Sequence, residues 1–425
     1  MEARVARLTK RTAPPFAALI TGTFALALPL SGARAQQNTG SSPCNAPTTE
    51  PIVHVALPGN PFTPVISSDG CWVFVALAGQ APASTPGVAV IKRGAGKLTL
   101  KRTVPLKAGG TGAVLTHDGK MLIVAAGSNI AFLDAAKLVS GAPSAVMGYL
   151  EVGEGTGAIY ANVTKNDALL FVALERTESI LVIDLAKLRR SGSFDSTVVL
   201  GRIPVGNAPI AVTLSNKDKY LYATSQSQAQ INGSWNWPLE CAPENPNAPL
   251  YAAKRSKGAV LVVDVARARK DAEHAVLAKV PVGCGPVRLV LSPDESTAWV
   301  TVRGEHSIVA VDTKKMLADP ANAVIMKMKV GTAPVGVAVV DGGKKVIATN
   351  SNRFAGGADD KQSLNVIDIS NGAAKASLLG LIPAGAFPRE LRITPDGKTL
   401  FASNFASKTL QVVDLSRLVL QKSAP

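Results

Sequence analysis

The sequence predicts an all-β fold, a seven-bladed β-propeller whose ring is closed by the N-terminal strand pairing in the last blade. Three observations predict this architecture. A short unit recurs along the chain, the strands of the unit are apolar on both faces, and an unpaired strand near the beginning matches a strand that is missing at the end.

The repeat is defined by the turn between its first and second strands. The equivalent turn positions are Asp69, Asp118, Asn166, Lys217, Asp294, Gly342 and Asp396. The steps between them are 49, 48, 51, 77, 48 and 54 residues, which is the length of a propeller blade in every case but one. The chain therefore holds seven units, and the long step predicts an insertion at about residues 227–257 in the fourth blade.

The strands inside each unit carry few polar residues on either face. Segments 219–224 and 400–404 are typical second strands, and segments 259–264 and 410–414 are typical third strands. Such runs fit blades that are covered by neighbours on both sides. Most third strands end in Asp, whose carboxylate we expect to accept hydrogen bonds from the backbone of the following turn.

Ring closure follows from the two ends of the repeat region. The last unit stops after its third strand, whereas residues 51–57 form a strand that belongs to no complete unit. We therefore expect Ile52 to Leu57 to pair with Leu410 to Asp414, which removes an exposed sheet edge. On this interpretation the propeller spans residues 51–418, after a lead-in of residues 36–50 and before a C-terminal tail of residues 419–425.

The first 35 residues resemble a cleavable signal peptide. Residues 4–11 are basic, residues 16–30 are apolar, and Ala33 and Ala35 form a small-residue cleavage site. The apolar run is too short to span a membrane, and no later segment is long enough. We therefore expect an exported protein, periplasmic or secreted, with no membrane span.

The net charge is strongly positive before and after cleavage. The full chain has 45 basic and 30 acidic residues; cleavage removes five and one of these, so 45−5=40 and 30−1=29 leave a charge of +11. A cationic surface attracts anionic partners such as nucleic acid. However, no basic run stands out, and aromatic residues make up only 5% of the chain, so few side chains could stack on nucleic-acid bases. Nucleic-acid binding is the weaker alternative, and the charge is explained by solubility.

The four cysteines all follow the predicted cleavage site, where oxidation is permitted. Four cysteines allow three pairings. The predicted blade positions favour Cys44–Cys71, which would fasten the closing strand, and Cys241–Cys284, which would pin the insertion. Each of these pairs shares a face of the ring and joins adjacent blades. Four free thiols are the alternative.

Parts of the repeat resemble two known families. Residues 203–209 followed by 221–224, and residues 331–334 followed by 347–350, resemble the YVTN-repeat seven-bladed β-propellers. This resemblance covers nearly the whole mature chain and implies an exported ligand-binding or protein-interaction scaffold. Residues 387–398 resemble the last blade of the lactonase-like propellers, which implies an alternative function, hydrolysis of a sugar lactone at the top of the central channel.

The loops divide between two faces of the ring. We define the top face by the turns that precede the first strands and by the loops between second and third strands, and the bottom face by the turns between first and second strands. Propellers commonly bind ligands at the top mouth of the channel. The second residue after the turn proline, or its equivalent, is Thr63, Gly112, Tyr160, Ala211, Arg288, Gly336 and Glu390 in blades one to seven. A repeat alone does not explain Tyr160, Arg288 and Glu390, so we predict ligand contact there. A plain Arg288–Glu390 ion pair, or two solvated side chains, is the alternative.

Further polar residues are expected on the top face. The complete set of ligand-binding candidates is Tyr160, Arg288, Arg303, His306, Arg389, Glu390 and Asn404. No spacing typical of a zinc site, no Gly-x-Ser-x-Gly elbow and no phosphate-binding glycine loop occurs in the sequence. We therefore expect no cofactor and no metal, assign no catalytic residue, and expect a monomer whose partner is a small molecule or a protein at the top face.

Overall fold

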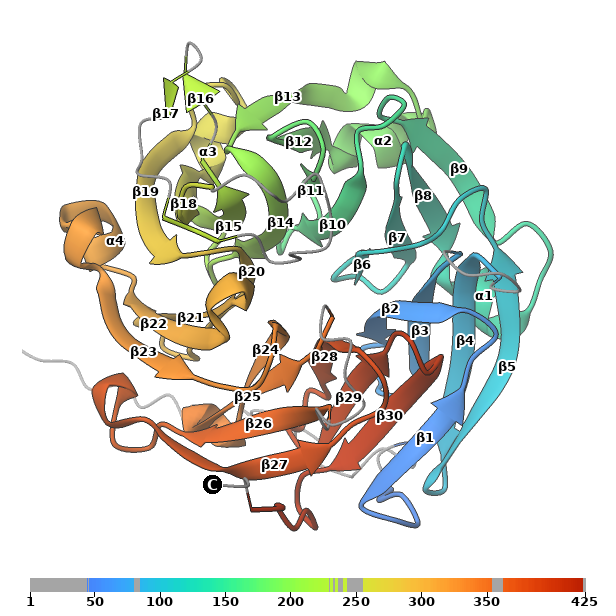
Figure 1. Ribbon diagram of the computed structural model, residues 1–425. Helices are drawn as coiled ribbons and strands as arrows, with labels where there is room; N and C mark the ends of the chain where they lie inside the picture. Colours follow the sequence, from blue (N-terminus) through green and yellow to red (C-terminus); the bar gives the residue numbers. More distant parts are fainter. Residues whose placement is uncertain are drawn as a thin grey trace, which may run out of the picture. The chain divides into compact units, whose positions relative to one another are not determined.

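The computed structural model describes residues 44, 46–79, 85–228, 230–231, 234–235, 240–242, 255–353 and 362–422. Within the unit from Ser41 to Pro425, seven four-stranded antiparallel sheets surround a common centre (Figure 1). The predicted seven-bladed β-propeller is thus confirmed. The predicted signal peptide and most of the insertion lie outside the described residues.

Each blade runs outward from an innermost first strand to an outermost fourth strand. Blades one to three consist of β2 (Asn60–Ile66), β3 (Trp72–Ala78), β4 (Gly87–Gly94) and β5 (Lys97–Pro105); β6 (Ala113–Leu115), β7 (Met121–Ala126), β8 (Asn129–Asp134) and β9 (Val146–Glu151); β10 (Ala158–Val163), β11 (Leu169–Leu174), β12 (Ser179–Asp184) and β13 (Val199–Pro204). Blades four and five consist of β14 (Asn207–Leu214), β15 (Tyr220–Ser227), β18 (Gly258–Asp264) and β19 (Val276–Gly283); β20 (Pro286–Leu291), β21 (Thr297–Val302), β22 (Ser307–Asp312) and β23 (Val324–Lys329). Blades six and seven consist of β24 (Pro334–Val340), β25 (Lys345–Asn350), β26 (Ser363–Asp368) and β27 (Ser377–Pro383); β28 (Pro388–Ile393), β29 (Thr399–Asn404), β30 (Thr409–Asp414) and β1 (Ile52–Ala56).

Burial follows strand position within the blade. The middle strands are covered on both faces; every residue of β7 and β11 is buried. The outermost strands alternate between exposed and partly buried residues, as in β5 and β23. This difference explains why the inner strands read as continuous apolar runs and the outer strands as alternating ones.

Adjacent blades are joined near the channel by a repeated hydroxyl group on the second strand. In blade five, Thr301 Oγ1 accepts the backbone N–H of Arg288 at 3.1 Å and donates to the carbonyl of Val335 in blade six at 2.7 Å. Equivalent pairs of bonds are made by Thr224 and Ser403. One hydroxyl therefore bonds a backbone N–H of the bulged first strand in its own blade and a backbone carbonyl in the next blade. Backbone groups that the bulge leaves outside the sheet ladder are paired in this way.

The aspartate that ends a third strand accepts backbone hydrogen bonds, as predicted. Asp134, Asp184 and Asp264 accept from the backbone N–H groups of residues 137, 187 and 267 at 2.9, 2.7 and 2.8 Å. The sequence did not predict what these bonds cap, namely the short helices α1 (Ala135–Ser140), α2 (Leu185–Ser191) and α3 (Val265–Ala268). Blade five carries a comparable helix, α4 (Lys315–Ala318), after Asp312.

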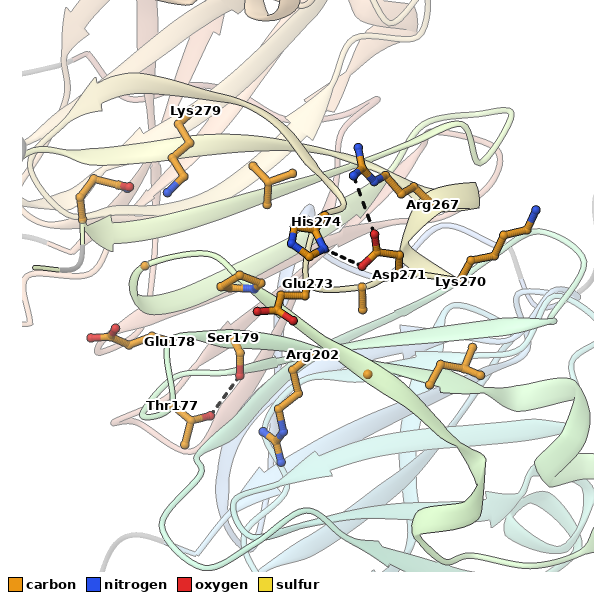
Figure 2. Close-up of a pocket in the computed structure, with 17 residues that line it drawn as sticks. Thr177, Glu178, Ser179, Arg202, Arg267, Lys270, Asp271, Glu273, His274 and Lys279 are labelled. Atoms are coloured by element: carbon orange, nitrogen blue, oxygen red, sulfur yellow. Dashed lines mark hydrogen bonds and ion pairs between the residues drawn. The ribbon is translucent and has the colours of Figure 1, made fainter. Parts of the chain in front are cut away.

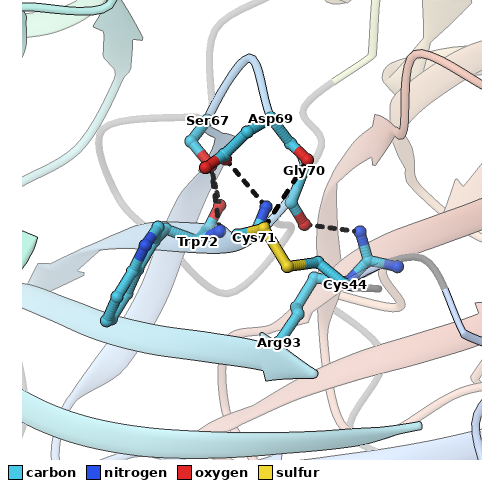
Figure 3. Close-up of a disulfide and its surroundings, with 7 residues drawn as sticks. All are labelled: Cys44, Ser67, Asp69, Gly70, Cys71, Trp72 and Arg93. Carbon is cyan, nitrogen blue, oxygen red and sulfur yellow. Dashed lines mark hydrogen bonds between the residues drawn. A yellow bond between two sulfur atoms is a disulfide. The ribbon is translucent and has the colours of Figure 1, made fainter. Parts of the chain in front are cut away.

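The N-terminal strand closes the ring by pairing with the predicted strand of the last blade. β1 pairs with β30, and the partners run from Ile52–Val413 to Ala56–Thr409. The Cys44–Cys71 disulfide fastens the segment before β1 to blade one (Figure 3). Beside it, buried Arg93 donates through Nη1 to the carbonyl of Gly70 at 2.9 Å. The closing strand is thus held by a sheet ladder on one side and by a covalent bond before it.

The second disulfide joins Cys241 of the insertion to Cys284 before β20. Both disulfides are the pairs expected from the sequence. The insertion also holds a two-stranded hairpin, β16 (Gln230–Ile231) with β17 (Ser234–Trp235). Among the described residues no helix is long and apolar enough to span a membrane.

Candidate functional site

Three of the predicted candidates meet across the centre of the ring. Arg288 on β20 donates through Nε to Glu390 Oε2 at 2.7 Å. The two residues therefore form the ion pair that was the alternative to ligand contact. Tyr160 on β10 donates through its hydroxyl to Glu390 Oε1 at 3.4 Å. The side chains of Arg288 and Glu390 are only 3% and 2% exposed. Residues from blades three, five and seven therefore form one buried polar cluster.

A fourth member, Arg392, was not among the candidates. It lies two residues after Glu390 on β28, so strand alternation directs both side chains to the same side. Its Nη1 donates to Glu390 Oε1 at 2.8 Å and its Nη2 donates to the Tyr160 hydroxyl. Unlike the other members, Arg392 is 32% exposed. The period of two along β28 could have identified it from the sequence.

Glu390 is ionised, and its single negative charge balances only one of the two positive charges of Arg288 and Arg392. Burial opposes ionisation of Glu390, but Arg288 and Arg392 outweigh that effect and lower its pKa. Burial raises the pKa of Tyr160, which stays a neutral phenol. Burial disfavours the charged form of Arg392, yet Tyr160 and Glu390 more than compensate and raise its pKa. Two guanidinium groups thus share one carboxylate, which leaves a net charge of +1 on these four groups.

The positive charge of Arg288 is only partly satisfied. Its Nη1 and Nη2 atoms are buried, and neither has a hydrogen-bond partner among the described residues. The guanidinium instead lies over the ring of Tyr160, with Cζ 4.4 Å from the ring centroid. A cation–π contact compensates part of the desolvation of an arginine but does not neutralise it.

A pocket of about 530 Å³ lies directly against this cluster. Its wall includes residues of all seven first strands, and its rim includes Ser68, His117 and Pro395 from the turns of the bottom face. Tyr160, Arg288, Glu390 and Arg392 all line it. The sequence placed Tyr160, Arg288 and Glu390 at a top-face site, whereas this pocket opens toward the bottom face. The difference arises because the first strands run the length of the channel, so side chains on them can face either mouth.

Arg389 lies on the other side of the cluster, toward the top face. Its Cζ is 3.8 Å from the ring centroid of Phe62 on β2 and 5.4 Å from those of Phe387 and Phe405 on top-face loops. No hydrogen bond or ion pair joins its guanidinium to any residue that the structure describes. Its pKa is lowered by burial and by repulsion from Arg288 and Arg353, against weaker opposing effects of Glu175 and Glu390. Arg389 is therefore a largely enclosed cation with no ion-pair or hydrogen-bond partner in the described part of the chain.

The phenylalanines around Arg389 were missed by the sequence analysis. In the other blades the residue at the position of Arg389 is mostly apolar, as with Phe62, Ile210 and Val335, which belong to one buried cluster. Phe387 and Phe405 pack against the same cluster. A single arginine in an otherwise apolar layer was visible in the repeat, but the ring contacts depend on which blades face each other.

The remaining three candidates hold loops in place. Arg303 is buried and donates through Nη2 to Gln226 Oε1 at 2.8 Å. His306 is exposed, and its Nδ1 accepts the backbone N–H of Ala333 at 3.0 Å. Asn404 is fully buried and donates to Thr409 and Gln411 on the neighbouring strand. None of these bonds connects the three residues to Arg389 or to the Glu390 cluster.

A larger hollow of about 1380 Å³ lies at the rim of the ring, between blades three and four (Figure 2). It is lined by outer strands β13 and β19 and by the turn after α3. Its charges have mixed sign and are partly paired. Asp271 Oδ1 lies 2.9 Å from His274 Nδ1, and Asp271 Oδ2 lies 3.8 Å from Arg267 Nη2. Because this hollow is open and its charges are partly paired, it is a weaker candidate for a ligand site than the central channel.

Comparisons with known proteins agree with the fold. A family model described as "Lactonase, 7-bladed beta-propeller" matches residues 244–418, which is less than half of the chain. Curated protein sequences gave no match. Similar solved structures include hydrazine synthase from Kuenenia stuttgartiensis, with a TM-score of 0.60 and 17% identity over 85% of this chain and 97% of that chain. A chain of a mitotic checkpoint complex has a TM-score of 0.60 and 13% identity over 92% of this chain and 98% of that one. At these identities the likeness shows the propeller fold alone.

Proposed function

We propose that this chain is an exported β-propeller that binds a small anionic molecule at the top mouth of its central channel. The observation that carries the proposal is Arg389, which is largely enclosed and has no ion-pair or hydrogen-bond partner among the described residues. An unpaired, desolvated guanidinium is costly, and a bound carboxylate or phosphate would relieve that cost through paired N–H donors. The two disulfides and the signal-like N-terminal segment support export.

The arrangement around Arg389 also favours a flat binding group. Phe62, Phe387 and Phe405 hold the guanidinium by ring contacts rather than by hydrogen bonds. Stacking fixes the plane of the group while leaving its N–H donors available. The site would therefore recognise the charge and geometry of an anion.

Calorimetric titration with gluconate, glucose 6-phosphate and glucose tests the proposal. We expect the wild type to bind at least one of the two anions and not the neutral sugar, and the two anions separate carboxylate from phosphate recognition. Arg389→Met should weaken binding by about tenfold or more, since a charge-assisted pair is lost. Arg190→Met, which removes the same charge from exposed helix α2, is the matched control and should bind as the wild type does. Equal binding by Arg389→Met, or no binding of either anion, would contradict the proposal.

A lactone hydrolase is the second candidate, supported by the family model over residues 244–418. Its most plausible base in the channel is Glu390, but both oxygens of this carboxylate are engaged and its pKa is lowered. A carboxylate held in this way is a weak proton acceptor. Binding is therefore the better supported function. A chromogenic lactone assay separates the two, because wild-type turnover that disappears in a Glu390→Gln protein shown by its melting curve to be folded would favour the hydrolase.

A further inference from the structure

The bottom-face pocket is a second ligand site, and we propose that it binds a small amphipathic carboxylate with an aliphatic body. It is separate from the top-face site, because Arg389 does not line it. Three features of the pocket carry the inference, namely its floor, its wall and its rim.

The floor of the pocket is the guanidinium of Arg392, and some of its N–H groups are not used within the protein. Arg392 has five N–H groups. Its Nη1 donates to Glu390 and to the carbonyl of Leu391, both at 2.8 Å, and its Nη2 donates to Tyr160. Nε–H and one Nη2–H then have no partner among the described residues. Since Arg392 is 32% exposed and lines the pocket, these donors are available to a carboxylate.

The charge at the floor selects an anion. Glu390 is the only carboxylate among the lining residues, and it already serves both Arg288 and Arg392. The floor therefore keeps a net charge of +1 at one end of the pocket. An anion would complete this charge balance, whereas a cation would meet repulsion in a setting where screening by water is reduced.

The wall above the floor is mostly aliphatic, and the polar side chains of Asn162 and Thr213 in it already donate to the backbone carbonyls of Val212 and Leu289 at 3.1 and 3.0 Å. First strands of six blades contribute Val65, Leu115, Val212, Leu289, Val337 and Ile393. Such a wall favours a hydrocarbon body over a sugar, because hydroxyl groups buried there would lack partners. A volume of about 530 Å³ lies within the usual range of small-molecule sites.

The rim offers little competing charge. His117, the remaining titratable lining residue, is held by Asp167, with Nδ1 and Oδ1 3.0 Å apart. Asp167 also accepts the backbone N–H groups of His117 and Asp118 at 2.8 and 3.1 Å. This carboxylate belongs to the turn network of the bottom face and is not among the lining residues. Ser68, in the corresponding turn of the neighbouring blade one, is exposed.

Calorimetry on the full-length mature protein with octanoate, octan-1-ol and octylamine tests the inference. We expect octanoate to bind, the alcohol to bind at least tenfold more weakly, and the amine not to bind. Arg392→Met should reduce octanoate affinity by about tenfold or more, the loss expected for one charge-assisted pair. Arg389→Met should leave octanoate binding unchanged, so that failure of this site and failure of the top-face site are distinguishable.

A second variant covers the case in which Arg392→Met fails to fold. Ser68→Trp places a large side chain at the exposed rim without touching the buried cluster, and it should also weaken octanoate binding by about tenfold or more. Thermal melting curves establish that each variant is folded. Equal binding of octanoate and octan-1-ol, no octanoate binding by the wild type, or unchanged octanoate binding in a folded Arg392→Met or Ser68→Trp variant would overturn the proposal.

Discussion

At the scale of single residues, the centre of this ring depends on one carboxylate. Glu390 is bonded by Arg288, Arg392 and Tyr160, which come from three different blades. The contacts of Arg288 and Tyr160 with this carboxylate are buried, and the contact of Arg392 is partly buried. The cluster therefore combines two functions, since it joins distant blades and it supplies the positive floor of the pocket.

Replacing Glu390 by Gln should strongly destabilise the fold. The amide keeps the size of the side chain but leaves two arginines without a counterion, and breaking a buried pair from one side costs about 3–5 kcal/mol. Adding Arg288→Met to Glu390→Gln should recover part of that loss, because one unpaired charge disappears with it. Chemical denaturation of the wild type, both single variants and the double variant measures the coupling. A Glu390→Gln protein within 0.5 kcal/mol of the wild type, on the order of normal surface variation, would rule out this role.

The same residue should make stability depend on acid. Because the folded pKa of Glu390 is lowered, its ionised form contributes stability above the unfolded pKa of about 4.3, and this contribution is lost as the pH falls through the folded pKa. The free energy of unfolding should thus decline more steeply below about pH 4 in the wild type than in Glu390→Gln. Denaturation curves at stepwise lower pH provide the comparison, and parallel pH profiles would contradict it.

At the scale of the elements, the second strands do more than fill the blade. The hydroxyls of Thr224, Thr301 and Ser403 each connect a bulged first strand to the first strand of the next blade. These residues occupy the same position in the repeat, and this repetition was visible in the sequence. Their partners were not, because a carbonyl in the next blade becomes a neighbour only once the ring has closed.

Thr301→Val should isolate the contribution of one such link. Valine has nearly the same shape, but it leaves the N–H of Arg288 and the carbonyl of Val335 without this partner in a buried position. The expected loss is about 1–3 kcal/mol, the cost of unsatisfied buried polar groups. Thr301→Ser keeps the hydroxyl and is the matched control, which should retain most of the stability. Denaturant midpoints of the three proteins decide the matter, and a valine variant as stable as the serine variant would show the link to be unimportant.

At the scale of the whole molecule, the repeat determined how much could be predicted. Blade number, ring closure and both disulfide pairs followed from the spacing of turns and from the incomplete last unit. The site could be predicted only in part. Residue types that break the repeat identified Tyr160, Arg288 and Glu390, but which of them meet, and toward which mouth, depends on their positions around the ring. Arg303, His306 and Asn404 show the limit of sequence-based reasoning, since their hydrogen bonds go to neighbouring strands and blades and not to the Glu390 cluster.

Removing the closing strand should turn the ring into an aggregating protein. A chain that begins at residue 58 lacks β1 and the Cys44–Cys71 bond, so β30 would present an unpaired edge to other molecules. Light scattering after size-exclusion chromatography should show large species for this chain. Full-length protein with Cys44→Ala and Cys71→Ala keeps the strand and loses only the covalent bond. It should remain unaggregated and lose about 2–4 kcal/mol, the usual contribution of a disulfide. If the shortened chain elutes as the full-length protein does and melts at the same temperature, β1 does not close the ring in solution.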